Sequence, residues 1–447
     1  MASAAEQLVA NINFGALSKA TELKKRIWFT LGALVIYRLG TYIPAPGIDP
    51  VILEQFFQQQ AGGILGMFNM FAGGALGRMT VFALNVMPYI SAAIIMQLMT
   101  AVSPSLEALK KEGEAGRKKI NQYTRYGTVG LAAVQSYGIA VGLENMTGPG
   151  GSAVLDPGLY FRFTTVVTLT GGTIFLMWLG EQITQRGVGN GISLIIFSGI
   201  VANLPLAVAS TLELGRTGAL SVGFIIFLLI MAVAVITFIV FMERAQRRIV
   251  VQYPKRQVGA KMFGGESSHL PMKLNPSGVI PLIFASALLL MPLSVVGFSG
   301  GAGPEWLTWV TSTLGRGQPT YLFLYIGLIV FFAFFYTGIV FNPADTADNL
   351  KKNGGFIPGI RPGSNTADYL SHILTRLTTV GAMYLALVAL LPEILISRFA
   401  VPFYFGGTSL LIVVSVTMDT VAQIHSHLLA HQYEGLIKKA KLRGRRG

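Results

Sequence analysis

About ten apolar segments, each long enough to cross a bilayer as a helix, constrain the fold of this chain more than any other feature. They lie at 27–43, 79–102, 126–143, 163–180, 191–209, 221–242, 277–298, 321–341, 376–396 and 404–429. Only 12% of the 447 residues are charged, whereas soluble domains have about 25%. The pattern predicts an all-α membrane protein of about ten transmembrane helices.

The basic residues predict which side of the membrane each loop occupies. Most of the 34 Lys and Arg lie in the N-terminal segment, in alternate loops and in the C-terminal tail. By the positive-inside rule this side is cytoplasmic, and both termini lie there. The first apolar run, at 27–43, has no small-x-small cleavage site after it, which favours a retained span over a signal peptide.

Five predicted spans precede a loop at 205–220 and five follow it. Two halves with an odd number of spans must lie in opposite orientations, which is the topology of an inverted repeat. We therefore expect an N-terminal half at 1–210 and a C-terminal half at 211–447, arranged around a central pathway.

The segment from Gly62 to Gly77 is apolar and rich in Gly, but it is too short to cross a bilayer. Such a segment cannot face lipid, because each unpaired backbone group would cost several kcal/mol. We expect it inside protein or beside a wet cavity; an apolar external loop is the alternative. Pro88 in the second span and Pro281 and Pro292 in the seventh are expected to bend those helices, which makes them candidate movable walls.

The sequence shows no set of residues typical of catalysis. The absence of Cys excludes thiol chemistry. His425, His427 and His431 cluster near Glu434, but a polar helix end leaving the membrane is the favoured interpretation over a metal site. GVGNG at 187–191 has no preceding strand and predicts a tight cytoplasmic turn rather than a phosphate loop. We expect no enzyme activity, no cofactor and no metal.

Four ionisable residues fall at membrane depth: Arg38, Arg78, Glu181 and Asp419. Such residues are functional candidates by default. The first three lie near span ends, where snorkelling to the surface is the simpler explanation. Asp419 lies deepest and could pair with a basic group, solvate a cavity or support packing.

Two predicted cytoplasmic loops, at 243–276 and 342–376, are too long and too organised to be simple connectors. In the first, basic residues flank the β-prone run IVVQY, which predicts a protruding hairpin with a basic tip; they include Arg247, Arg248, Lys255, Arg256 and Lys261. In the second, Arg361 lies between Gly-Ile and Pro-Gly in a stiff turn. These cations suit anionic partners such as RNA phosphates; the alternative is that they only fix the topology.

Seven stretches make the chain recognisable: YRLGTYIPAPGID, MFNMFAGGALGR, KKEGEAGRKKINQYTRYGT, MWLGEQITQRGVGNGIS, ERAQRRIVVQYPKRQ, FNPADTADNLKKNGGFIPGIRPG and VPFYFGGTSLLIVVSVTMD. In these stretches, and in their order and spacing, the chain resembles the SecY family over nearly its whole length. Members of this family are the central channel subunits of bacterial Sec protein translocases.

The resemblance implies an hourglass pore whose external half is closed by a plug. The plug corresponds to a half-helix at 62–76, with Met67, Phe68, Asn69 and Phe71. The implied waist is a ring of aliphatic side chains: Val86, Ile90, Ile192, Ile196, Ile283 and Ile412. An apolar constriction of this kind resists water and ions by dewetting. Val86 replaces the expected isoleucine, so the ring is expected to be slightly wider there.

The family also has a lateral gate toward lipid, which the resemblance places between the second and seventh spans near Ser91 and Met291. Arg361 and the loop at 243–276 match the family's docking surface for the SecA motor or a translating ribosome. SecE and SecG are the membrane partners that the resemblance implies.

The implied function is a protein-conducting channel of the cell inner membrane that passes unfolded preproteins or signal sequences. Apolar segments of about 20 residues would leave through the gate into the lipid bilayer. A secondary transporter of a small solute is the alternative, and it predicts polar ligands near the midplane. A membrane-embedded enzyme is disfavoured by the missing catalytic set.

Overall fold

The computed structural model describes residues 20–59, 69, 72–144, 147–148, 151–218, 221–253, 256–258, 261–263, 267–298, 318–399 and 407–443. The chain divides into two compact units. The first comprises Met1–Leu206, Leu290–Thr311 and Val416–Gly447, and the second comprises Ala207–Leu289 and Ser312–Ser415. The predicted division into inverted halves at 210 and 211 stays a prediction.

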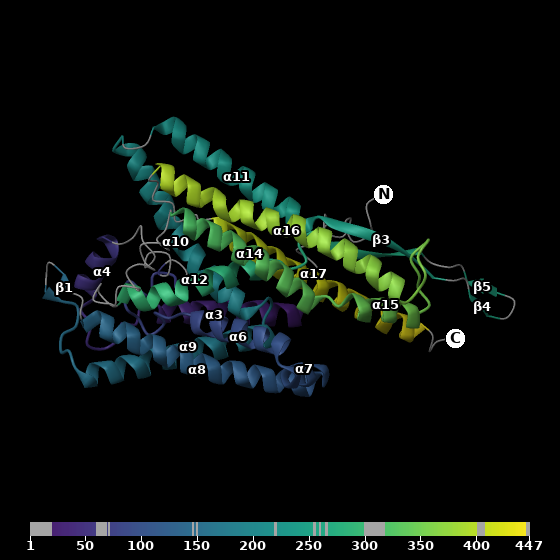
Figure 1. The fold of residues 1–447 in the computed structure, drawn as a ribbon, viewed down its shortest axis with the longest axis horizontal. Helices are drawn as coiled ribbons and strands as arrows, with labels where there is room; N and C mark the ends of the chain where they lie inside the picture. The colour runs from purple at the N-terminus through teal and green to yellow at the C-terminus, as the bar shows by residue number, and fades with distance from the viewer. Residues whose placement is uncertain are drawn as a thin grey trace. The chain divides into compact units, whose positions relative to one another are not determined.

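The first unit is built around a layer of long helices in which α8 lies alongside α9 and packs against α6 (Figure 1). Its elements are α3 (Thr21–Gly40), α4 (Pro50–Gln59), α6 (Met87–Val102), α7 (Pro104–Lys111), α8 (Glu114–Glu144), β1 (Thr147–Gly148), β2 (Gly151–Ser152), α9 (Leu159–Arg186) and the start of α10 (Gly191–Arg216). The strands β1 and β2 form a short antiparallel hairpin.

The second unit combines apolar helices with an antiparallel hairpin. Its elements are α11 (Val222–Arg244), β3 (Gln246–Gln252), β4 (Arg256–Val258), β5 (Lys261–Phe263), β6 (Ser267–Lys273), α12 (Ile280–Phe298), α14 (Pro319–Val340), α15 (Pro343–Lys352), α16 (Ser364–Phe399) and α17 (Gly407–Arg443). Helices α12 and α17 each continue into the first unit. Helix α16 packs against both α14 and α15.

Each of the ten predicted segments overlaps one described helix. Six described helices are long and apolar enough to span a membrane, and the pair α6 and α7, bent by 98°, makes up to seven. They are Leu159–Arg186, Gly191–Arg216, Val222–Arg244, Pro319–Lys352, Ser364–Leu391 and Thr408–Leu429. The prediction of a helical, multi-pass membrane protein is confirmed, whereas the count of ten spans stays a prediction.

The second predicted span begins later than expected. Residues 72–86 form consecutive turns rather than a helix, and Met79 and Asn85 adopt φ of 45° and 50°. Helix α6 starts only at Met87, with Pro88 in its first turn. The prediction that Pro88 bends the middle of a helix is therefore wrong; proline suits a helix start because the first-turn N–H groups have no helical partner.

The prediction of a loop at 205–220 is also wrong for most of that range. Helix α10 continues through Pro205 and ends at Arg216. Proline removes one helical hydrogen bond but is tolerated in apolar helices whose neighbours satisfy the freed backbone. The flanking Leu and Ala residues are strong helix formers. The next helix, α11, begins where the Ser221 hydroxyl accepts a hydrogen bond from the Phe224 N–H at 3.2 Å.

An ion pair closes the connection between α8 and α9. Both Arg162 Nε and Nη2 donate to Glu144 Oε2, at 2.9 and 2.6 Å. The Gly158 N–H donates to Glu144 Oε1 at 3.0 Å. The Glu144 side chain is only 9% exposed, and the hydrogen bond from Arg162 is the main reason that its pKa lies below the ordinary value.

We expect Glu144→Gln to lower the melting temperature of the purified protein by a few degrees at neutral pH, because the half-buried Arg162 guanidinium loses its charged partner. A lowered carboxyl pKa contributes stability above the ordinary pKa of 4.5 and loses it as the pH falls through the folded-state pKa. The difference between the native protein and the variant should therefore be constant from about pH 7 to 5 and shrink in more acidic solution. Glu213→Gln, in an exposed pair with Arg216, is the matched control and should change little. Equal effects of the two substitutions would contradict this prediction.

Candidate functional site

Four of the six predicted waist residues lie in the first unit, on two helix starts. Val86 is the N-cap of α6, and its carbonyl accepts the Ile90 N–H at 3.0 Å. Ile192 and Ile196 lie in the first two turns of α10, one helical turn apart. Val86, Ile90 and Ile196 are 1%, 4% and 4% exposed. Each pair therefore projects from one side of its own segment.

The other two waist residues lie in the second unit. Ile283 is in the first turn of α12, where it is half-buried. Ile412 lies on α17 and is 1% exposed. Both are aliphatic, as a dewetting constriction requires. The assembly of all six side chains into one ring stays a prediction.

The predicted plug lies mostly outside the described residues, and this includes Met67, Phe68 and Phe71. Asn69 is described, and it anchors the start of the turns that follow. Its Oδ1 accepts the Gly77 N–H at 2.7 Å, and its backbone carbonyl accepts the Gly74 N–H at 2.8 Å. The role of the segment as a plug stays a prediction.

Two arginines join the same turn segment to α3 and to Tyr42, which lies just after α3. Arg38 Nη1 donates to the Gly73 carbonyl at 3.2 Å, and Arg38 Nη2 to the Tyr42 hydroxyl at 3.5 Å. The Arg78 guanidinium lies 4.3 Å from the centroid of the Tyr42 ring, within cation–π range. Both arginines contact protein, and snorkelling of their charged ends toward water stays a prediction.

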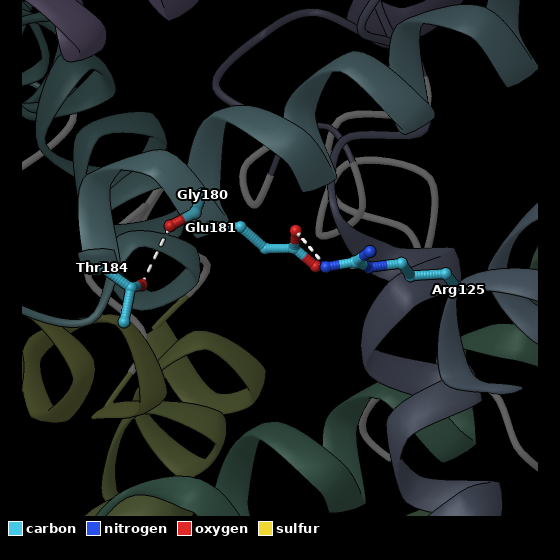
Figure 2. Close-up of polar contacts among 4 residues, drawn as sticks. All are labelled: Arg125, Gly180, Glu181 and Thr184. Carbon is cyan, nitrogen blue, oxygen red and sulfur yellow. Dashed lines mark hydrogen bonds and ion pairs between the residues drawn. The ribbon is translucent and has the colours of Figure 1, made fainter. Parts of the chain in front are cut away.

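Glu181 forms an ion pair with another helix. Figure 2 shows its carboxylate facing Arg125 of α8, with Arg125 Nε to Glu181 Oε1 at 2.8 Å and Nη2 to Oε2 at 2.7 Å. This bidentate geometry is the strong form of an ion pair. The pair joins α8 to α9, and snorkelling of Glu181 stays a prediction.

The two residues predicted for the lateral gate are on α6 and α12. Ser91 is 7% exposed and lies in the first turns of α6. Met291 belongs to α12, but its side chain lies outside the described part of the chain. The gate between these helices stays a prediction.

The predicted hairpin at 243–276 is confirmed. Strand β3 pairs antiparallel with β6, and β4 pairs with β5 beyond them, as Figure 1 shows. Arg247 and Arg248 are exposed on β3. Lys255 lies outside the described residues, and Arg256 and Lys261 are placed on β4 and β5 by their backbone only.

The hairpin is fixed to the start of α16 by an apolar cluster. Ile249 of β3 and Met272 of β6 are each 5% exposed, and they pack with residues of α16 and of the loop before it: Ile357, Leu370, Ile373, Leu374 and Leu377. The Gln252 and Phe356 backbones also form a β-bridge. The two loops predicted to dock a partner are therefore one folded platform.

The turn that carries Arg361 is held by two hydrogen bonds, and its stiffness stays a prediction. The Ile360 N–H donates to the Ile357 carbonyl at 3.1 Å across Pro358 and Gly359. The Thr366 hydroxyl donates to the Arg361 carbonyl at 2.9 Å. The Arg361 side chain is exposed beside the platform.

No metal site is found among the described residues: no three of their His, Asp and Glu side chains come close enough together to hold an ion. His425 and His427 lie on α17, while the side chains of His431 and Glu434 are outside the described part. Asp419 is exposed on α17, and its pairing, cavity or packing role stays a prediction.

The sequence did not point to Thr30 and Gln423. These residues bond the backbone of the turn at 187–191, across 158 and 234 positions of the chain. Periodicity and local motifs report only on neighbours in the sequence, so no signal could have identified them. The turn itself was predicted and is confirmed, with Gly189 at φ +91°.

Comparison with known proteins decides what kind of protein has this site. The SecY family model matches residues 80–421. The chain belongs to the SecY family. Two SecY relatives named protein translocase subunit SecY match it over nearly their whole length. The one from Escherichia coli strain K12 is 56% identical over 424 residues, which cover 95% of this chain and 96% of the relative. The one from Vibrio cholerae is 54% identical over 433 residues, with 96% and 97% covered.

Solved channel structures share the fold. A structure described as a protein-conducting channel has a TM-score of 0.63 at 18% identity and covers 91% of this chain and 92% of its own. Sec61 in the canine ribosome–channel complex from the endoplasmic reticulum has a TM-score of 0.60 at 18% identity, with the same coverage. The SecY resemblance read from the motifs and the helical channel fold are both confirmed.

Proposed function

We propose that this chain is the protein-conducting channel of a translocase, through which unfolded polypeptides cross the inner membrane. The observation that carries the proposal is the near full-length relation to a protein translocase subunit at 56% identity. The chain performs no chemistry in this proposal. It supplies a path, and a partner supplies the energy.

The path runs through a waist lined by aliphatic side chains, which include Ile90, Ile196 and Ile412. Such side chains fit around an extended peptide and exclude ions when the pore is empty. A translocating segment of about 20 apolar residues gains more free energy in lipid than in the pore and leaves between α6 and α12. This sideways exit corresponds to the lateral gate near Ser91 and Met291.

The hairpin β3–β6 and Arg361 form the surface for the driving partner, either the SecA motor or a translating ribosome. A ribosome-bound relative among the solved structures supports the second partner. SecE and SecG complete the complex in the membrane. In this proposal the platform and both termini lie in the cytoplasm, which the excess of basic residues in these loops supports.

The test is disulfide crosslinking. Because the chain has no Cys, only the introduced Cys can form a disulfide from it. Cys would be placed at Ile283 and at successive positions of an arrested secretory precursor in inner-membrane vesicles. We expect crosslinks that move along the precursor as it advances and that need SecA and ATP. Phe323→Cys, on α14 at a site 77% exposed, is the matched control and should not crosslink.

Absence of crosslinks at Ile283, while the vesicles still translocate the precursor, would contradict the channel path. The small-solute transporter would then be reconsidered. That alternative needs polar ligands near the midplane, whereas the waist residues are aliphatic.

A further inference from the structure

The turn between α9 and α10 is held by side chains from two distant helices. The Val188 N–H donates to Thr30 Oγ1 of α3 at 3.0 Å. The next N–H, of Gly189, donates to Gln423 Oε1 of α17 at 2.8 Å. Buried backbone donors need acceptors, and here consecutive donors are satisfied by α3 and α17.

Packing around the turn is equally close. Val188 is 2% exposed and lies in an apolar cluster formed by Ala20, Leu23, Ile27, Ile424 and Leu428. A side chain at Gly187 would place its Cβ 2.4 Å from Thr30 Oγ1. Gly189 adopts φ +91°, a conformation that disfavours other residues. The turn therefore has little freedom to move relative to α3 and α17.

The beginning of α10 is fixed to α9 in the same way. The Gly191 N–H donates to Thr184 Oγ1 at 2.9 Å, and that hydroxyl donates to the Gly180 carbonyl at 2.9 Å, as Figure 2 shows. The predicted waist residues Ile192 and Ile196 follow within two turns of this point. A shift of the turn would therefore move both of them.

We propose that Thr30 and Gln423 are positioning residues of the channel: they fix the start of α10 and thereby hold Ile192 and Ile196 in the sealing position. The inference rests on the proposed channel function, since it concerns the seal of that channel. Neither residue touches the polypeptide; each acts through the turn at 187–191.

The experiment measures the ion leak of purified, assembled channel complexes in planar bilayers without substrate. Gln423→Leu removes the acceptor for Gly189, and Gln423→Glu keeps one. We expect the leak to rise about fivefold or more in the first variant, as loss of a coupling near 1 kcal/mol predicts, and to stay near the native level in the second. Thr30→Val and Thr30→Ser form a second pair with the same expected contrast.

Gln185→Leu is the matched control, because Gln185 is exposed at the end of α9. It should leave the leak unchanged. A merely structural role would lower the yield and the melting temperature of the variants without opening the assembled channels to ions.

The proposal is overturned if both acceptor-free variants seal as well as the native channel, or if Gln423→Glu leaks as much as Gln423→Leu. It is also overturned if neither acceptor-free variant assembles, because the proposal requires the channel to fold without these bonds. Failure of the native complex to translocate a precursor would instead contradict the proposed function.

Discussion

Replacement of Arg361 with Glu is expected to lower partner-driven protein translocation at least about tenfold, the effect of losing about 1.4 kcal/mol of partner binding. Arg361 is exposed on a turn that is bonded at both ends. A rigid presentation of this kind lowers the entropy lost on binding. Reversal of its charge places like charges at an interface that should be complementary.

The measurement is the rate at which vesicles import a precursor with SecA and ATP, at low and at high salt. Arg361→Lys should retain part of the activity, because lysine keeps the charge but lacks the planar guanidinium. Lys352→Glu is the control for charge alone, since Lys352 is exposed at the end of α15 in the same loop. Equal loss in Arg361→Glu and Lys352→Glu would show that net charge, rather than the presented arginine, matters.

Replacement of Arg38 with Met is expected to raise the ion leak of the resting channel about tenfold or more. Arg38 donates to the Gly73 carbonyl at 3.2 Å, and hydrogen bonds from charged groups are worth about 1.5–3 kcal/mol. Gly73 has φ +65°, and a Cβ there would lie 2.9 Å from both Arg38 Nη1 and the Gly199 Cα of α10. The end of the predicted plug segment, at Gly73, is thus wedged between α3 and α10, and Arg38 supplies its charged contact.

The ion leak is measured in planar bilayers, with variant complexes that are purified in the same yield as the native complex. Arg38→Lys should leak less than Arg38→Met, since it retains a donor. Arg216→Met removes an arginine that is 79% exposed and forms an exposed ion pair with Glu213, and it should have no effect. A tight channel in Arg38→Met would disprove the role of Arg38 as an anchor.

Local features of this protein could be predicted well from its sequence. The helices, the hairpin β3–β6 and the Arg361 turn follow from apolar length, β-propensity and the Pro and Gly positions. Pro88 and Pro205 show where local rules fall short. The same residue type begins α6 and lies inside α10, because the surrounding protein decides which backbone donors need partners.

Contacts between distant segments could not be predicted. Nothing in the spacing of Arg125 and Glu181, or of Thr30 and Val188, indicates that they meet, since each pair depends on how separate helices pack. Residues 72–86 illustrate the same limit: their apolar composition suggested a helix, but contacts with α3 and α10 hold them in turns. The family motifs supplied the functional assignment that physical patterns alone left open.

The length of α16 has a mechanical consequence. Its 36 residues extend about 54 Å at 1.5 Å per residue, well beyond the hydrocarbon thickness of about 30 Å. In the proposed orientation its N-terminal turns lie outside the bilayer, and the apolar cluster around Leu370 and Ile373 fixes them to the hairpin. In that orientation a force on the hairpin would be transmitted into the bilayer along one continuous helix.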